Sequence, residues 1–222
     1  MFPPIERSWR RILDWTAAHV PHALVEGASE AELDAAERRL GFPLPPESRL
    51  WWTLERPGDV GLVPPFHDFI DLDTALDIRE MALDVRGPGT SPTGDPQAGG
   101  TPLPDDRAAG TPPYDYSPRF LPIACDGAGD HVYVDLRDGE RHGCVMYWAH
   151  DDANDEPAEW LGLAHMLDDI AEALETGRPA GLWSYRDRGE DVTEDSGDVP
   201  VVVDTGRGPA LEWRTPDEVR VD

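Results

Sequence analysis

Carboxylates gather at two turns in the second half of the chain. Asp126 and Asp130 bracket a Gly-Ala-Gly turn, and Asp151 and Asp152 closely follow the aromatic residue Trp148. A negative rim of this kind could contact the arginines and lysines of a partner protein. The alternative is a solvated loop ahead of a helix, where negative charge is favourable in any case. We treat all five residues as candidates for partner binding.

Histidines near the same turns raise the question of a metal site. His131, His142 and His150 would have to converge with Asp151 and Asp152 at the ends of the expected strands. No His-Glu-x-x-His motif occurs, and the aspartates around residue 126 lack the spacing and the closing glutamate of an EF-hand. Histidines on the surface of a hairpin are the commoner case, so we expect no metal.

The sequence carries few signatures of an enzyme. All 19 basic residues are arginines, so neither a lysine Schiff base nor a Walker A lysine exists. No Gly-x-Ser-x-Gly elbow is present. Cys125 and Cys144 fall on strands that we expect to be neighbours, but no base is marked beside either thiol. We expect two small buried cysteines, no catalytic site and no cofactor.

Two adjacent tryptophans, Trp51 and Trp52, stand on an expected short helix. We expect that they cannot both face the core, so that one lies near the surface. Exposed tryptophan is enriched at binding hot spots, which makes Trp51, Trp52 and Trp148 candidates for partner binding. The alternative is that a neighbouring segment of the chain covers them.

The charge balance narrows the choice of partner. Asp and Glu total 45, which gives a net charge of −26. Such a chain lacks the basic face that nucleic acid or an anionic membrane surface requires, and it suits a basic protein. The alternative is that the acidity serves solubility alone. No apolar run approaches membrane-spanning length and Met1–Arg11 lacks the apolar stretch of a signal peptide, so we expect a cytoplasmic protein.

Apolar periodicity and capping signals predict an α+β fold. A capping box at Ser29 and Glu32 opens the second helix, Gly41 ends it, and Pro46 can open the third. Alternating apolar residues around the turn at Asp138 predict an antiparallel sheet with one buried face. The expected helices are Ile5–Val20, Ser29–Leu40, Glu47–Leu54, Asp73–Asp84 and Glu156–Thr176. The expected strands are Phe66–Leu72, Phe120–Cys125, His131–Arg137 and Gly143–Ala149.

We expect one domain, residues 1–183, with two additions. Residues 87–118 are rich in proline, glycine, threonine and aspartate and lack apolar periodicity, which predicts a flexible insertion. Residues 184–222 form an acidic tail. Within that tail, Val199–Val203 and Ala210–Arg214 are candidates for short strands that dock on the domain.

Two blocks of the sequence resemble the Smi/Knr-type branch of the SUKH superfamily. The first, ASEAELDAAERRLGFPLPPESRLWW at 28–52, is a capped helix leading through Leu-Gly-Phe-Pro-Leu-Pro-Pro into an aromatic helix. The second, FLPIACDGAGDHVYVDL at 120–136, is followed by GCVMYWAHDD at 143–152. The chain departs from the family at 55–58, where Glu-Arg-Pro-Gly stands in place of Asn-Gly. The resemblance implies a twisted antiparallel sheet packed against helices, and binding rather than catalysis.

The resemblance also supplies two functional hypotheses. Bacterial members are largely immunity proteins that neutralise toxins, often nucleases, which here would mean binding a basic toxin through the acidic sheet face and the hairpin ends. The fungal branch scaffolds cell-wall signalling, which here would mean that the insertion and the tail recruit partners. A hydrolase with a carboxylate or metal site is a third, weaker alternative.

Overall fold

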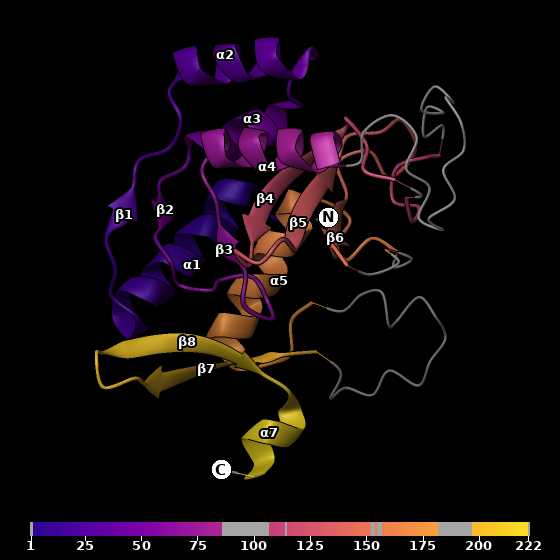
Figure 1. The fold of residues 1–222 in the computed structure, drawn as a ribbon. Helices are drawn as coiled ribbons and strands as arrows, with labels where there is room; N and C mark the ends of the chain where they lie inside the picture. The colour runs from indigo at the N-terminus through magenta and orange to yellow at the C-terminus, as the bar shows by residue number, and fades with distance from the viewer. Residues whose placement is uncertain are drawn as a thin grey trace.

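A computed structural model describes residues 2–85, 107–113, 115–151, 154, 157–181 and 197–221. Its helices are α1 (Ile5–His19), α2 (Glu30–Leu40), α3 (Pro46–Thr53), α4 (Leu72–Val85), α5 (Leu163–Thr176) and α7 (Pro216–Val221). Its strands are β1 (Leu24–Val25), β2 (Arg56–Pro57), β3 (Asp68–Phe69), β4 (Phe120–Cys125), β5 (His131–Asp135), β6 (Val145–Trp148), β7 (Val199–Asp204) and β8 (Pro209–Arg214). The predicted α+β class is confirmed (Figure 1).

The N-terminal helices begin and end where their capping residues require. The hydroxyl of Ser29 accepts a hydrogen bond from the backbone N–H of Glu32, and the Glu32 carboxylate accepts one from the N–H of Ser29. Gly41 closes α2 with a φ of 80°, a left-handed conformation that favours glycine. Pro46 is the first residue of α3. These boundaries confirm the predictions.

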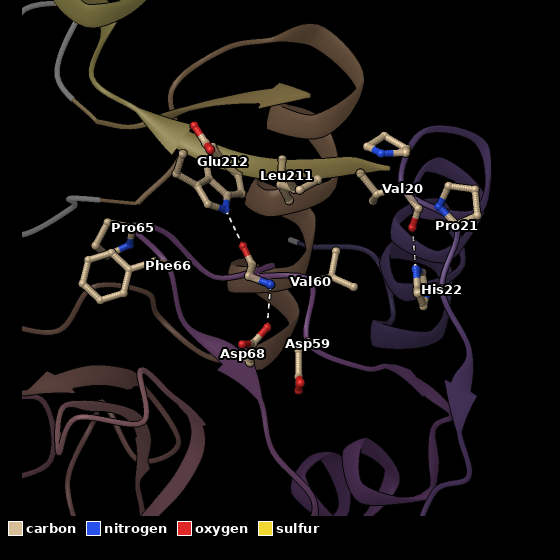
Figure 2. A pocket seen from close by; sticks show the side chains of 14 residues that line it. Val20, Pro21, His22, Asp59, Val60, Pro65, Phe66, Asp68, Leu211 and Glu212 are labelled. Carbon is tan, nitrogen blue, oxygen red and sulfur yellow. Dashed lines mark hydrogen bonds between the residues drawn. The ribbon is translucent and has the colours of Figure 1, made fainter. Parts of the chain in front are cut away.

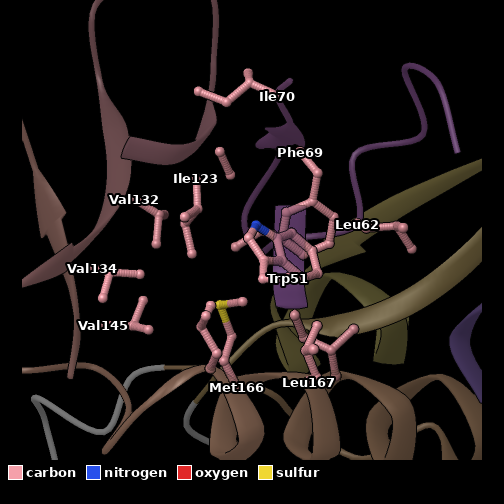
Figure 3. Packing of buried hydrophobic residues seen from close by; sticks show 14 of the residues in the cluster. Trp51, Leu62, Phe69, Ile70, Ile123, Val132, Val134, Val145, Met166 and Leu167 are labelled. Carbon is pink, nitrogen blue, oxygen red and sulfur yellow. The ribbon is translucent and has the colours of Figure 1, made fainter. Parts of the chain in front are cut away.

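A four-stranded antiparallel sheet in the order β3-β4-β5-β6 lies at the centre of the fold. Val132 and Val134 of β5 point from one face into the main core, where they meet Met166 and Leu167 of α5 (Figure 3). Helix α1 packs beside α5, and α4 packs against β4 (Figure 1). In the described part of the chain, no helix is both long and apolar enough to cross a membrane.

Both tryptophans of α3 are buried, so the prediction that one lies near the surface was wrong. Trp51 and Trp52 are 1% and 0% exposed. Trp51 meets Trp9 and Phe69 edge-on, at ring-centroid distances of 5.2 and 4.9 Å. Trp52 lies under the buried guanidinium of Arg56, 5.4 Å from its ring centroid. The core surrounds α3 on more than one side, and this enclosure cannot be deduced from a helical period.

The second face of the sheet is also buried, which corrects the prediction of a single buried face. Phe120, Tyr133 and Met146 project from this face into a second apolar cluster, which Tyr116 joins. Tyr116 belongs to the expected insertion, so the part of that segment at 107–113 and 115–118 is packed and carries buried residues. The remainder, residues 87–106, lies outside the described residues. Among the described residues, this face of the sheet is covered and offers no open acidic surface to a partner.

A buried ion pair ties this covering segment to the sheet. Asp135 of β5 and Arg137 are 0% and 3% exposed, and their side chains lie 2.7 Å apart. Asp135 also accepts a hydrogen bond from the backbone N–H of Gly110, and Arg137 donates one to the carbonyl of Thr111. The pair therefore connects β5 to the segment that covers its second face.

The start of α5 differs from the sequence pattern, whereas the C-terminal strands agree with it. Helix α5 begins at Leu163 rather than near residue 156, because the backbone of Trp160 forms a bridge with Val145 at the edge of β6. The predicted tail strands are confirmed as the antiparallel hairpin β7–β8. Leu211 and Trp213 of β8 join the main core, so this hairpin docks on the rest of the fold.

The burial of Trp52 predicts a large loss of stability on truncation. Trp52→Ala should lower the free energy of unfolding by about 3–5 kcal/mol, because it removes a fully buried indole and leaves a cavity. Trp52→Phe should cost much less, since the indole N–H has no acceptor among the described residues. Urea unfolding measures both changes, and equal losses from the two variants would contradict this packing.

The buried ion pair predicts a coupled effect on the covering segment. Asp135→Asn should destabilise the protein by about 3–5 kcal/mol, because it removes the buried carboxylate that pairs with the Arg137 guanidinium. Hydrogen exchange of residues 107–113 should accelerate in this variant. The double variant Asp135→Leu with Arg137→Met should recover much of the stability, and a double variant as unstable as Asp135→Asn would refute the argument.

Candidate functional site

The structure separates the predicted binding residues into two groups. Trp51 and Trp52 lie in the core and cannot contact a partner in this fold. Asp126 and Asp130 flank the turn between β4 and β5, and Asp151 lies close to Asp130. Trp148 is largely buried but lines a pocket beside that turn. Asp152 lies outside the described residues.

This pocket, which we name the turn pocket, has a volume of about 480 Å³ and lies between α4 and the β4–β5 turn. Its apolar wall includes Met81, whose side chain is 65% exposed, and the ring of Trp148. Its polar rim carries Asp130 and His150. The lining residues are Ile78, Met81, Ala82, Cys125, Gly127, Ala128, Gly129, Asp130, His131, Trp148 and His150.

The β4–β5 turn is shaped by its own aspartate. One carboxylate oxygen of Asp126 accepts hydrogen bonds from the N–H groups of Ala128, Gly129 and Asp130, at 2.8, 3.1 and 3.0 Å. Gly129 has a φ of 128°, and a Cβ atom there would lie 2.9 Å from the His150 ring. Glycine is therefore required for His150 to close over the turn.

Asp130 joins the turn to the end of β6. It accepts hydrogen bonds from the Tyr147 hydroxyl at 2.6 Å and from the His150 backbone N–H and Nδ1 at 2.9 and 2.7 Å. Burial alone raises the pKa of Asp130, but these bonds outweigh it and hold that pKa below its ordinary value. In return, the hydrogen bond to Asp130 raises the pKa of the exposed His150.

His131 lies under the turn and is only 2% exposed, so the expectation of a surface histidine was wrong at this position. Burial lowers the pKa of His131 to about 4, which keeps the imidazole neutral at physiological pH. Its ring stacks on Trp148, with centroids 6.4 Å apart, and meets Tyr116 edge-on. His131 therefore belongs to the floor of the turn pocket.

The structure also tests which of the histidines and aspartates could share a metal. Ligand atoms of Asp130, His150 and Asp151 lie within 4.8 Å of one another, whereas His131 and His142 are not members of this group. Carboxylate and imidazole groups can bind divalent cations, but here His150 Nδ1 and Asp130 already bond to each other. The absence of a metal stays a prediction.

A second pocket adjoins the turn pocket and shares Cys125 and Gly127 with it. This aspartate pocket has a volume of about 440 Å³, and four of its lining residues are aspartates. Its single lining arginine, Arg56, is buried and donates to the backbone carbonyls of Ile70 and Trp52. The four aspartates are Asp59, Asp68, Asp71 and Asp126.

Sequence reasoning missed three of these four aspartates. Asp71 caps α4, since its carboxylate accepts a hydrogen bond from the N–H of Thr74, and an Asp-x-x-Thr signal at that helix start could have marked it. Asp68 accepts one from the N–H of Gly61. Asp59 follows a Pro-Gly turn and is exposed. Only the fold brings three separate turns together around one pocket.

The acidic residues of the helices have a different environment from those of the pockets. Arg39 pairs with Asp77 and Glu80, and Arg49 pairs with Glu30, Asp34 and Glu37. Within the described residues, no arginine forms an ion pair with any of the four pocket aspartates. No direct ion pair therefore neutralises these four aspartates, although the charge of Arg56 attracts that of Asp71.

The two cysteines are free, and they do not lie on neighbouring strands, because β5 separates β4 from β6. Burial raises the pKa of both thiols, to about 12 for Cys144. A thiol with a raised pKa carries little thiolate at neutral pH, so neither cysteine is poised as a nucleophile.

The Asp130–His150 pair predicts two distinct histidine titrations. In an NMR titration, His150 should titrate above its ordinary pKa of about 6.5 and His131 near 4, with signals assigned from single His→Gln variants. The folded pKa of His150 is raised above its unfolded value of about 6.5. The ion pair with Asp130 therefore stabilises the folded protein fully below about pH 6.5, and this stabilisation is lost as the pH rises through the raised pKa. Asp130→Asn should lower the pKa of His150 toward its ordinary value, because it removes the largest cause of the shift and leaves only the attraction of Asp151 and Asp126. An unchanged His150 titration in that variant would contradict the pairing.

Comparison with known proteins agrees with this fold. No curated protein matches the chain. The family model for the SMI1 / KNR4 family (SUKH-1) matches residues 27–173, which is 147 of the 222 residues. The match begins just before α2 and ends within α5. It therefore includes the whole central sheet, the turn pocket and the β4–β5 turn that both pockets share. The chain therefore belongs to the SMI1 / KNR4 (SUKH-1) family.

Proposed function

We propose that this protein is a non-catalytic binding domain that neutralises a basic protein toxin by direct contact, as an immunity protein does. The observation that carries the proposal is the set of aspartates without arginine partners beside exposed apolar side chains. Membership of the SMI1 / KNR4 family is consistent with a binding role. The free cysteines suit the reducing cytoplasm, where we propose that it acts.

The turn pocket and the aspartate pocket fit the chemistry of arginine and lysine side chains. A long aliphatic stem could lie against Met81 and Trp148 while its cationic end reaches the rim at Asp126 and Asp130. Enzymes that bind nucleic acid carry basic surfaces around their active sites. The basic surface of such a toxin would be complementary to the net charge of −26 of this chain. Occupation of such a basic site by the acidic rim would exclude the nucleic acid.

The proposal predicts a partner that is captured in a salt-dependent way. A pull-down from the native organism at low salt should recover one basic protein, and high salt should release it, because exposed charges are screened. Expression of that protein alone should arrest the growth of host cells, and co-expression of this chain should restore growth.

Matched variants locate the contact. Asp59→Asn with Asp126→Asn removes two pocket charges, and Glu6→Gln with Asp14→Asn removes two exposed charges on α1. The pocket variant should weaken capture at least tenfold and abolish growth rescue, whereas the α1 variant should retain both. Equal effects would show that only net charge matters. Recovery of several unrelated proteins, with no toxin among them, would favour the scaffold hypothesis instead.

A further inference from the structure

The hairpin β7–β8 lies beyond the family match and forms one wall of a third pocket (Figure 2). This hairpin pocket has a volume of about 520 Å³ and lies between β8 and the loop that leads into β3. Leu211 and Glu212 line it from the hairpin, and Asp59 and Phe66 line it from the loop (Figure 2).

The hairpin wall is held in place by specific contacts. Trp213 is buried and donates a hydrogen bond from Nε1 to the carbonyl of Gly61 at 2.7 Å (Figure 2). The N–H of Gly61 in turn donates to Asp68 of β3 at 2.5 Å. The backbone of Ala180, beyond α5, also forms a bridge with Asp198 ahead of β7. The pocket is therefore a built part of the fold and not a contact of a loose tail.

The hairpin pocket continues the site already described. It shares Asp59 and Asp68 with the aspartate pocket, which itself shares Cys125 and Gly127 with the turn pocket. The three pockets thus adjoin in series, from β8 past β3 to the β4–β5 turn. A single side chain fills one such pocket, whereas an extended segment can place successive side chains in several.

Each pocket in the series combines the same two chemical features. One exposed apolar side chain lines each of them: Phe66 is 59% exposed in the hairpin pocket, Val25 is 48% exposed in the aspartate pocket, and Met81 lines the turn pocket. Each also contains a carboxylate, and Asp59 in the hairpin pocket has no arginine partner, whereas Glu212 pairs with Arg214. Each pocket therefore complements a side chain that has an apolar stem and a cationic end.

We propose that the three pockets form one extended binding surface, and that the C-terminal hairpin adds a subsite for an arginine side chain in an extended segment of the basic partner. Arginine suits this subsite because its stem and planar guanidinium can contact the exposed Phe66 ring, while Asp59 from the loop and Glu212 from the hairpin place carboxylates in the same pocket. The inference rests on the proposed function and assigns part of the contact to a segment outside the family match.

Fluorescence anisotropy with a labelled ten-residue peptide of alternating arginine and alanine tests this surface at about 150 mM salt, where nonspecific charge attraction is screened. The hairpin pocket is changed in the double variant Phe66→Ala with Glu212→Gln, which we call the hairpin variant. It removes one exposed apolar side chain from the loop and one carboxylate from β8. The matched control, Leu161→Ala with Asp14→Asn, makes the same two kinds of change at exposed positions that line none of the three pockets. The hairpin variant should bind the peptide at least tenfold more weakly, and the control should bind within about twofold of the parent chain.

The other outcomes separate a failure of this inference from a failure of the proposed function. If Asp126→Asn, which changes the aspartate pocket alone, weakens binding but the hairpin variant does not, the surface ends before the hairpin and the proposed function still stands. If every variant binds like the control, the peptide is held by net charge and the extended surface is refuted. If this chain binds the peptide but fails to restore growth when it is co-expressed with the captured protein, the immunity role is refuted and the extended surface still stands. Unchanged thermal unfolding of the hairpin variant confirms that its effect is local.

Discussion

Burial of both faces of a small sheet is the constraint on which the rest of this structure depends. Strand β5 sends Val132 and Val134 into one apolar cluster and Tyr133 into another, so its polar side chains have no open surface to reach. Asp135 must therefore find its counter-charge inside the protein, and Arg137 supplies it. The same coverage moves any contact with a partner from the sheet face to the turns at the strand ends.

The distribution of charge follows from this arrangement. Helices present acidic residues at spacings that arginines of neighbouring helices can reach, as Arg39 and Arg49 do. The turns at residues 59, 71 and 126 gather on a side of the molecule where the nearest lining arginine, Arg56, is buried and bonded to carbonyls. Arginines thus pair with many acidic residues of α2 and α4, whereas the four pocket aspartates are left without a direct ion pair among the described residues, which supports the proposed binding of a basic partner there.

The C-terminal hairpin packs on the core of the family domain and, in the proposed surface, adds a binding wall outside the family match. Leu211 and Trp213 enter the main apolar cluster, and both also line the hairpin pocket together with Glu212 and Phe66. An addition of this kind can alter which partner is recognised while the central sheet keeps its packing. We regard the hairpin as the part of this chain where partner specificity is most open to variation.

The sequence by itself determined the features that depend on neighbours along the chain. The capping box at Ser29, the stop at Gly41, the strands around the β4–β5 turn and the family itself could all be predicted, because short-range hydrogen bonding and apolar period are local properties. Only the tertiary structure decided the burial of Trp51, Trp52 and His131, the separation of the two cysteines by β5, and the meeting of Asp59, Asp71 and Asp126. These depend on which segments cover one another, and the packing of a segment such as 107–118 over a sheet leaves no periodic signal in its own residues.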